Sequence, residues 1–362
     1  MKKLWLVCII VTLIIVLCAC NIKNLFAKKI ETPQPSVIGN IIFWSEIEGA
    51  EKYAVFCNNE QIAETIGVGY IAESSAENKQ YHIVALGGDG FKDSSPSQKV
   101  VVYKSTQYSS EETMVISLEN DREYLVPMNI NYVTVSGSAQ NTNIKIADRF
   151  SDLVILLQDV TLTSSHGKSC ITTSDNDYSM TTKKYNVTLQ CKGTNHLTGG
   201  IGYDAEGKPD TNSGKKGFNG EEGGSGIILP SLLLIGDGAL YLQGADGGNG
   251  GTGADSSGLF SSAVYGKGGN GGNGGAGIKC TRMAMNMTNG GICSAYGGIG
   301  ATGGKPGSNG SALTGPFYTA QWDSSYGSNG ENGLSVTGSI IQCNGSLMGD
   351  FATSQVKAIA IY

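Results

Sequence analysis

Hydrophobic residues recur at every second position in short runs along most of the chain, and clusters of Gly, Asn, Asp and Ser separate the runs. This alternation is typical of half-buried β-strands rather than of amphipathic helices. In the first third of the chain, the runs are Ile41–Trp44, Tyr53–Cys57, Tyr81–Ala85 and Val100–Tyr103. Several short strands at this spacing predict a β-sandwich for residues 37–105.

Residues 110–362 contain repeated units. A segment that begins at Gly226 returns 51 residues later at Gly277, and again 56 residues further on at Gly333. Fainter copies lie at Leu153–Ser164 and Tyr185–Gly199. Stacked units of this kind predict a right-handed parallel β-helix, because a single coil cannot bury its apolar face alone. The alternative is an antiparallel sandwich. Both interpretations make the protein all-β.

Glycine is concentrated in one part of the chain. Of the 53 glycines, 44 lie from Gly193 onwards, mainly in three inserts at residues 199–225, 244–276 and 297–332. The inserts are either flexible surface linkers, because glycine has high conformational entropy, or packed polyglycine II strands, in which the missing Cβ lets backbones approach. The three-residue rhythm of GKGGNGGNGGAG, residues 266–277, favours packed strands.

The N-terminus indicates the compartment. Lys2 and Lys3 precede an apolar stretch that ends at Cys20, a pattern typical of an export signal. We expect residues 1–20 to be a signal peptide or an uncleaved signal anchor, and residues 21–36 to be a linker. Both alternatives predict a protein at the extracellular face of the cell membrane, held there either by a lipid on Cys20 or by the uncleaved anchor.

Charge and cysteine content exclude some classes of function. The formal net charge is −6 and no basic stripe is present, so a nucleic-acid partner is not expected. No CxxC pair suggests a metal or redox site. Six scattered cysteines are interpreted as small core residues, with disulfide pairing as the alternative: Cys57, Cys170, Cys191, Cys280, Cys293 and Cys343.

Two segments in the first third of the chain resemble known families. Leu17-Cys18-Ala19-Cys20 is similar to the bacterial lipoprotein box, which implies lipidation of Cys20. The residues Ile42-Phe43-Trp44, Gly49-Ala50-Glu51-Lys52-Tyr53-Ala54-Val55 and Tyr81-His82-Ile83-Val84-Ala85, followed by Gly90 and Ser94-Ser95-Pro96-Ser97, resemble a fibronectin type III domain. That resemblance implies a spacer or a weak binding module.

Three segments of the repeat region resemble the β-helical carbohydrate-binding lipoproteins of anaerobic Gram-positive bacteria. They are VILLQDVTLT (residues 154–163), YNVTLQCKGTNHLTGG (residues 185–200) and GALYLQG (residues 238–244). The resemblance implies that the partner is a polysaccharide or a cell-surface glycan. The long glycine-rich inserts depart from that family.

Catalytic motifs are lacking. The three histidines lie in separate segments, and no HExxH, GxSxG or Cys/His signature accompanies them. Acidic residues are scattered, although carboxylates from distant positions leave a β-helix polysaccharide lyase or hydrolase open. No cofactor is predicted. Calcium binding stays an alternative. A calcium-binding nonapeptide repeat needs aspartate at a fixed position, and Asp246 and Asp255 do not repeat in register.

One group of large side chains stands out in the third insert: Phe317, Tyr318, Gln321, Trp322, Asp323 and Tyr326. Sugar rings present apolar C–H faces, so aromatic side chains beside amide and carboxylate groups predict a carbohydrate-binding site. The alternative is that these aromatics pack the insert onto the β-helix. We expect a non-catalytic carbohydrate-binding surface protein, with a polysaccharide-degrading enzyme and an adhesin that uses the glycine-rich loops as alternatives.

Overall fold

The computed structural model describes residues 27–73, 75, 77–88, 90–103, 109–173, 185–205, 215–255, 266–306, 325–344, 346–350 and 356–358. The chain divides into two compact units, with the boundary after Gln107. Within the described ranges the regular elements are β-strands, apart from a 3₁₀ turn at Ser110–Glu112. None of the described residues form a helix long and apolar enough to span a membrane.

The N-terminal unit contains two antiparallel sheets and a short parallel pair. One sheet has the order β2 (Ser36–Ile38), β3 (Ile41–Phe43), β6 (Gly69–Ile71), and the other β5 (Glu60–Thr65), β4 (Ala50–Cys57), β7 (Lys79–Gly87), β9 (Val100–Val102). The parallel pair is β1 (Lys28–Lys29) with β8 (Phe91–Lys92). Trp44 and Tyr53 are buried in the core with their ring centroids 5.3 Å apart. Each of the four predicted runs contains a strand.

The second unit is built from three columns of parallel strands. Column one contains β10 (Thr113–Ser117), β12 (Tyr132–Ala139), β14 (Leu153–Thr163), β16 (Val187–Lys192), β19 (Ser231–Gly236), β21 (Ile278–Met287), β23 (Val336–Asn344) and β25 (Val356–Ala358). Column two continues from β14 through β17 (Thr194–Thr198), β20 (Ala239–Gln243), β22 (Ile292–Tyr296) and β24 (Ser346–Met348). Column three contains β11 (Glu123–Val126), β13 (Asn143–Ile146), β15 (Ile171–Thr173) and β18 (Ile227–Ile228), and ends on β21.

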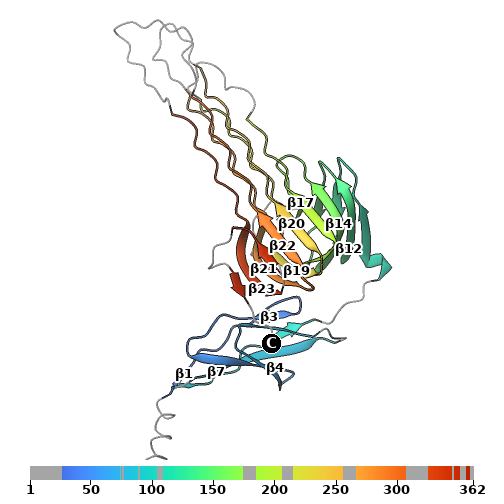
Figure 1. Ribbon diagram of the computed structural model, residues 1–362, viewed down its shortest axis with the longest axis vertical. Helices are drawn as coiled ribbons and strands as arrows, with labels where there is room; N and C mark the ends of the chain where they lie inside the picture. Colours follow the sequence, from blue (N-terminus) through green and yellow to red (C-terminus); the bar gives the residue numbers. More distant parts are fainter. Residues whose placement is uncertain are drawn as a thin grey trace, which may run out of the picture. The chain divides into compact units, whose positions relative to one another are not determined.

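Long strands that belong to two columns curl the sheet. The first part of β14 pairs with β16, and its last three residues pair with β17. Likewise, β21 pairs with β18 at its start and with β19 over the rest of its length. Figure 1 shows the curved stack that results. The curled parallel sheet is consistent with the predicted β-helix. The antiparallel alternative is wrong, because the strand pairs described in this unit are parallel.

The strand register tests the repeat lengths. Leu232 pairs with Met283, which confirms the 51-residue offset. The next offset is longer than the sequence predicted, since Ile278 pairs with Val336, 58 residues further on. The ladder between β21 and β23 shifts register after Lys279, so that a constant offset cannot describe it.

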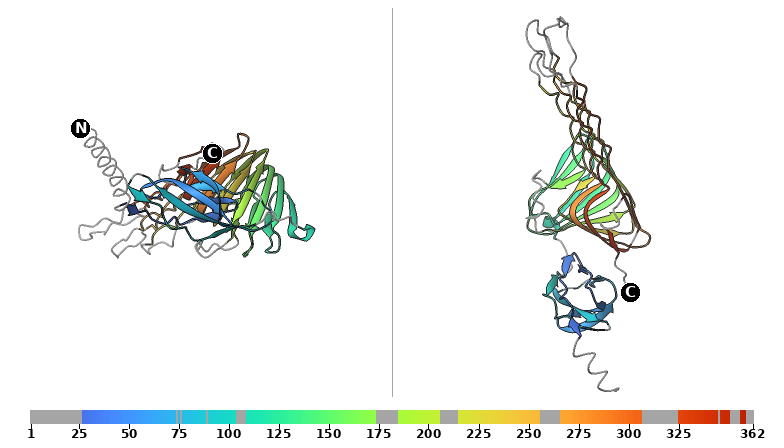
Figure 2. Two further views of the ribbon diagram at one scale, coloured as in Figure 1. Left: turned by 90° about the horizontal axis from the view of Figure 1, so that it is seen from below. Right: turned by 90° about the vertical axis from the view of Figure 1, so that its left-hand side faces the viewer.

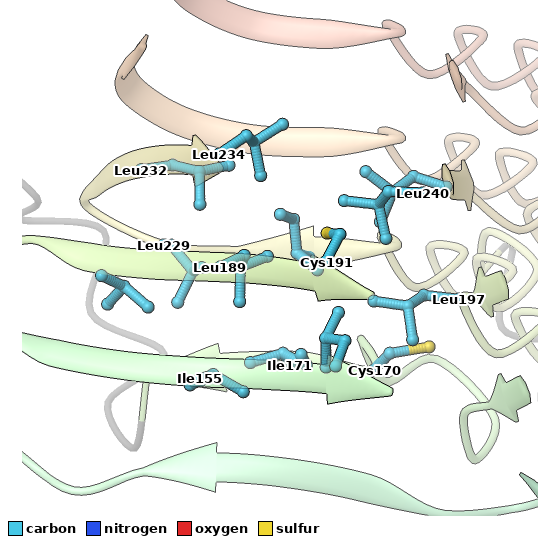
Figure 3. Close-up of a cluster of buried hydrophobic side chains, with 14 of the residues drawn as sticks. Ile155, Cys170, Ile171, Leu189, Cys191, Leu197, Leu229, Leu232, Leu234 and Leu240 are labelled. Atoms are coloured by element: carbon cyan, nitrogen blue, oxygen red, sulfur yellow. The ribbon is translucent and has the colours of Figure 1, made fainter. Parts of the chain in front are cut away.

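Inward-facing side chains of the three columns form one continuous apolar core. Leu189 of β16 is fully buried and pairs in register with Ile155 on one side and with Leu234 on the other. Figure 3 shows these side chains converging from successive strands. Burial of such a column offsets much of the entropy cost of ordering the strands.

Cysteines contribute to this core as predicted. Four of them are free and buried in the second unit: Cys170, Cys191, Cys280 and Cys293. Burial raises the pKa of the Cys191 thiol to about 12, so it stays protonated at neutral pH. Cys57 is also free and is half-buried in the N-terminal unit, whereas the side chain of Cys343 lies outside the described set.

The glycine-rich inserts form an ordered bundle. Outgoing segments (residues 199–205, 244–255 and 297–306) continue from β17, β20 and β22, and returning segments (residues 215–226, 266–277 and 325–334) lead back to β18, β21 and β23. We call these six segments the glycine-rich bundle. Figures 1 and 2 show them extending side by side from one edge of the curled sheet.

Backbone hydrogen bonds join the segments of the bundle at every third residue. In segment 266–277, Gly272 N donates to Gly248 O of an outgoing segment at 2.8 Å, and Gly271 N donates to Ser328 O of a returning segment at 3.0 Å. The same pattern repeats one triplet away in each direction. This is the arrangement of packed polyglycine II strands, which confirms that interpretation over flexible linkers for the described residues.

The close approach of these backbones requires glycine. A Cβ on Gly272 would lie 1.8 Å from the carbonyl oxygen of Glu221, and one on Gly269 would lie 1.8 Å from that of Phe218. No side chain can enter at such positions without separating the segments. Each triplet therefore places small residues inside and one larger residue on the outer face.

Candidate functional site

The exposed face of column two carries two stacked rings. His196 of β17 and Tyr241 of β20 are register partners, and their ring centroids lie 4.7 Å apart with an interplanar angle of 11°. Their sequence neighbours Leu197, Leu240 and Leu242 are buried. Because side chains alternate across a strand, the two rings point away from the core.

A hollow of about 490 Å³ lies at the start of the same two strands, and its lining reaches the residues that precede the rings by two positions. Thr194 and Ala239, which precede the rings by two residues on the same face, help to line it, together with Lys192 and Asp237. Both charged side chains are exposed, and neither forms an ion pair among the described residues. The hollow thus offers an ammonium, a carboxylate and a hydroxyl beside an aromatic platform.

A third aromatic ring extends the platform along the strands. Tyr296 of β22 is the register partner of Gln243, two residues beyond Tyr241, and its side chain is 43% exposed. Gln243 Nε2 donates to the carbonyl oxygen of Gly297 at 3.0 Å, which fixes the side-chain amide of Gln243 next to the residue that follows Tyr296. We call the following residues the sheet-face site: Lys192, Thr194, His196, Asp237, Tyr241 and Tyr296.

A second stack lies where the bundle begins. The rings of His166 and Tyr203 are 4.2 Å apart and nearly parallel, with an interplanar angle of 13°. His166 Nδ1 lies 3.0 Å from Ile201 O, and Tyr203 N donates to a carboxylate oxygen of Glu221 at 3.1 Å. These contacts fix the first outgoing segment to the loop that follows β14.

A smaller pocket of about 280 Å³ lies where the returning segments meet β18, β21 and β23. Its polar wall includes Glu222, Asn273 and Glu331. Asn273 Nδ2 donates to Glu222 Oε1 at 3.3 Å, and Glu331 N donates to Asn273 Oδ1 at 2.9 Å. The side chains of Glu222 and Asn273 already form hydrogen bonds within the bundle. We therefore do not regard this pocket as a binding site.

Asparagine and aspartate side chains cap the backbone amides on the outer faces of the bundle. Asn219 Oδ1 accepts from Asn270 N at 2.9 Å, and Asn270 Oδ1 accepts in turn from Ser328 N at 3.3 Å. The opposite face repeats the pattern, with Asp246 Oδ1 accepting from Ile299 N at 2.7 Å. The three-residue rhythm therefore specifies both the glycine interior and the acceptors that cover exposed amides.

Carboxylates of the curled sheet also have structural partners. Asp152 accepts from Asn186 N at 2.7 Å, and Asp159 accepts from Thr194 N at 3.0 Å. Glu123 binds Lys145 and Lys168, and the hydrogen bond from Lys145 is the main reason that its pKa falls to about 2. No group of three or more His, Cys, Asp or Glu side chains able to hold a metal occurs among the described residues.

The structure tests little of the predicted carbohydrate site. Tyr326 lies at the start of the last returning segment and is 61% exposed. Phe317, Tyr318, Gln321, Trp322 and Asp323 lie outside the described residues, as does Cys20. The structure therefore shows an exposed ring at one of the six predicted positions.

Sequence reasoning missed the sheet-face site. The alternation in TNHLT, ALYLQ and ICSAY does place His196, Tyr241 and Tyr296 on the polar face of their strands. That signal identifies outward-facing rings. It does not show that His196 and Tyr241, 45 residues apart in the chain, become neighbours, because this depends on the strand register.

Comparisons with known proteins leave the family open. No protein-family model matches the sequence, and no curated protein matches it. One solved structure, described as "Structure of FN3tt mut", matches with 23% identity over 20% of this chain and 89% of that chain, at a TM-score of 0.14. At this TM-score the likeness carries no argument about the fold.

Proposed function

We propose that the protein is a non-catalytic carbohydrate-binding protein, tethered to the membrane and exposed at the extracellular face of the cell. Its partner is a polysaccharide or a cell-surface glycan. One observation carries the proposal: the stacked pair His196 and Tyr241 lies on the same strand face as a hollow, lined by Lys192 and Asp237, that begins two residues before the rings.

The chemistry of sugars suits this combination. A pyranose ring has an apolar C–H face that stacks on aromatic rings, while its hydroxyl groups need donors and acceptors at the edge. Binding sites typically combine an apolar surface with a few placed polar groups. The parallel strands hold these groups on a rigid support, so little entropy is lost when a sugar binds.

The rest of the chain fits this role in outline. In the proposal, Cys20 carries the lipid or ends a signal anchor, the N-terminal unit is a fibronectin type III-like spacer, and the second unit is a right-handed β-helix. The sequence motifs and the antiparallel and parallel sheets support this arrangement.

Binding without catalysis is favoured because the polar groups beside the stack do not form a paired-carboxylate site. Asp237 is the carboxylate that lines the hollow, and Asp159, which lies beside Gly193 of the lining, accepts a hydrogen bond from a backbone amide. Glycosidic cleavage usually requires two carboxyl groups across the scissile bond. Release of reducing ends from a panel of polysaccharides would instead support the alternative, a lyase or hydrolase.

The sheet-face site can be tested by removing its rings. Tyr241→Ala with His196→Ala should lower affinity on a glycan array by about thirtyfold, since the two rings contribute about 1 kcal/mol each. Phe150→Ala is the matched control, because Phe150 is a fully exposed aromatic residue between β13 and β14. Unchanged glycan binding by the double variant would remove the sheet-face site, and a blank array would overturn the proposed function.

The glycine-rich bundle favours a second candidate function, that of an adhesin. Its hydrogen-bonded segments form a stiff support that extends from one edge of the curled sheet. Deletion of residues 307–324 should then reduce adhesion to host or bacterial cells while glycan binding by the sheet-face site persists. Adhesion that survives this deletion would exclude residues 307–324 as the adhesive element.

A further inference from the structure

Side chains that cap backbone amides occupy every third residue on the outer face of the returning segments. At the end of the bundle far from the curled sheet, other side chains take these positions. Asn219 and Glu222 occupy outer positions in segment 215–226, three residues apart. Asn270 and Asn273 occupy the matching positions in segment 266–277. All four side chains accept hydrogen bonds from the next segment, three of them from a backbone amide and Glu222 from the side chain of Asn273.

Lysines take the next positions in the same two rows. Lys216 lies three residues before Asn219, and Lys267 lies three residues before Asn270. A lysine ammonium is a donor with no acceptor capacity, so Lys216 cannot cap a backbone amide as Asn219 does. We call this end of the bundle, at residues 216–218, 267–268 and 325–326, the distal turn. Its outer positions carry hydrogen-bond donors where the next triplet carries acceptors.

The two lysines belong to adjacent segments. Gly217 N donates to the carbonyl oxygen of Lys267 at 2.8 Å, which places the two side chains at neighbouring outer positions. Lys216 is exposed and Lys267 is half-buried, and neither forms an ion pair among the described residues. Like charges held side by side without a counter-charge are unfavourable unless an anion lies between them.

Exposed rings lie at the same level of the bundle. Phe218 is 54% exposed, and its carbonyl oxygen accepts from Gly251 N. Tyr326 is 61% exposed and follows Ser325, whose carbonyl oxygen accepts from Gly268 N. This end of the bundle thus combines two ammonium groups that form no ion pair with the described residues and two exposed aromatic rings.

We propose that the distal turn of the bundle binds a polyanionic polysaccharide through Lys216 and Lys267. This inference rests on the proposed carbohydrate-binding function and adds a second site, separate from the sheet-face site. The two ammonium groups bind carboxylate or phosphate groups along the glycan chain, and Phe218 and Tyr326 contact its sugar rings. The fixed spacing of the segments sets the spacing between the two bound anions.

Charge-neutral variants test this site directly. Lys216→Asn with Lys267→Asn removes both ammonium groups and restores the capping side chain found one triplet away. Affinity for alginate should fall about tenfold at low salt, because two ion pairs of up to about 1 kcal/mol each are lost. The melting temperature should stay equal or rise, since the amide caps now continue into the distal turn.

Two further variants separate the site from general charge. Lys216→Arg with Lys267→Arg keeps both charges and should retain at least half of the affinity. Lys28→Gln with Lys92→Gln removes the same charge from exposed positions of the N-terminal unit and should leave affinity unchanged. Equal losses from this control and from the asparagine variant would overturn the proposal.

The choice of probes separates this proposal from the function on which it rests. Dextran, a neutral glycan, should bind equally to wild type and to the asparagine variant, whereas Tyr241→Ala should weaken dextran binding. Failure of all glycans to bind would overturn the proposed function and this site together. Alginate binding that the asparagine variant retains would overturn this site alone, and so would equal lysine-dependent binding of a single-stranded oligonucleotide.

Discussion

The curled sheet and the glycine-rich bundle stack chain segments in parallel rows by opposite means. In the sheet, large apolar side chains fill the space between the strand columns, and Leu189, Ile155 and Leu234 are all fully buried. In the bundle, backbones contact backbones, and hydrogen bonds such as Gly272 N to Gly248 O replace the apolar core.

This contrast teaches that the two regions tolerate opposite changes. The sheet depends on side-chain volume, so it is sensitive to truncation. The bundle depends on the absence of side-chain volume, so it is sensitive to the addition of a single methyl group. Substitutions that change size in each direction should therefore have opposite effects in the two regions.

Truncation in the sheet should have the largest effect. Leu189→Ala should lower the free energy of unfolding of the second unit by about 3 kcal/mol, because it leaves a cavity between neighbouring strands that cannot collapse. Chemical denaturation measures this loss. Gln190→Ala, the next residue on the outer face of β16, is the control and should change stability by less than about 0.5 kcal/mol. Equal effects of the two variants would contradict a packed interior.

A methyl group in the bundle should have the next largest effect. The Cβ of Gly272→Ala would lie 1.8 Å from Glu221 O, so the segments must separate, at a cost of about 1–3 kcal/mol. Amide hydrogen exchange across residues 266–277 should rise sharply. In Gly251→Ala the nearest atom is a Cβ at 3.2 Å, so this control should keep wild-type protection. Rapid exchange in the wild type itself would contradict an ordered bundle.

Much of the fold could be predicted from residue periods. A period of two located the strands, and a period of three distinguished packed strands from linkers in residues 266–277. The second repeat offset was wrong, because the ladder shifts register after Lys279 and no sequence signal marks such a shift. Pairing direction could not be read from alternation either, since alternation is common to both kinds of sheet.

Less of the candidate site could be predicted, for a physical reason. Tyr326 belongs to a cluster that is local in sequence, so it was easy to find. The sheet-face site joins His196 to Tyr241 across two strands, and only the register of the parallel ladder brings them to 4.7 Å. The two residues are 45 positions apart in the chain, so their proximity is invisible in any local window of the sequence.

Loss of a cap should affect the bundle more modestly than loss of its packing. Asn270→Ala removes the oxygen that accepts from Ser328 N at 3.3 Å and should lower stability by about 1 kcal/mol. Asn270→Asp keeps an acceptor, as Asp246 does on the opposite face, and should retain most of the protection of the Ser328 amide. Hydrogen exchange at that amide separates the two variants. Equal protection in both would show that the cap is not needed.

Surface charge should have the smallest effect, and Glu123 of β11 is the clearest case. The hydrogen bond from Lys145, with those from Asn143 and Lys168, lowers the pKa of its carboxyl to about 2, below its ordinary value of about 4.3. A lowered pKa in the folded state stabilises the fold above the ordinary pKa. This contribution is therefore complete above about pH 5 and is lost as the pH falls through 4 towards 2.

The group is largely exposed, so screening by solvent limits its contribution to less than about 1 kcal/mol. Glu123→Gln should be less stable than wild type at pH 7 by that amount, and the two proteins should converge near pH 2. Urea denaturation between pH 2 and pH 7 measures the difference, and 1 M salt should reduce it. Glu119→Gln, which removes a 2.8 Å surface pair with Arg122, is the matched control and should show a smaller difference. A pH-independent gap between Glu123→Gln and wild type would mean that β11 depends on the packing of the side chain rather than on its charge.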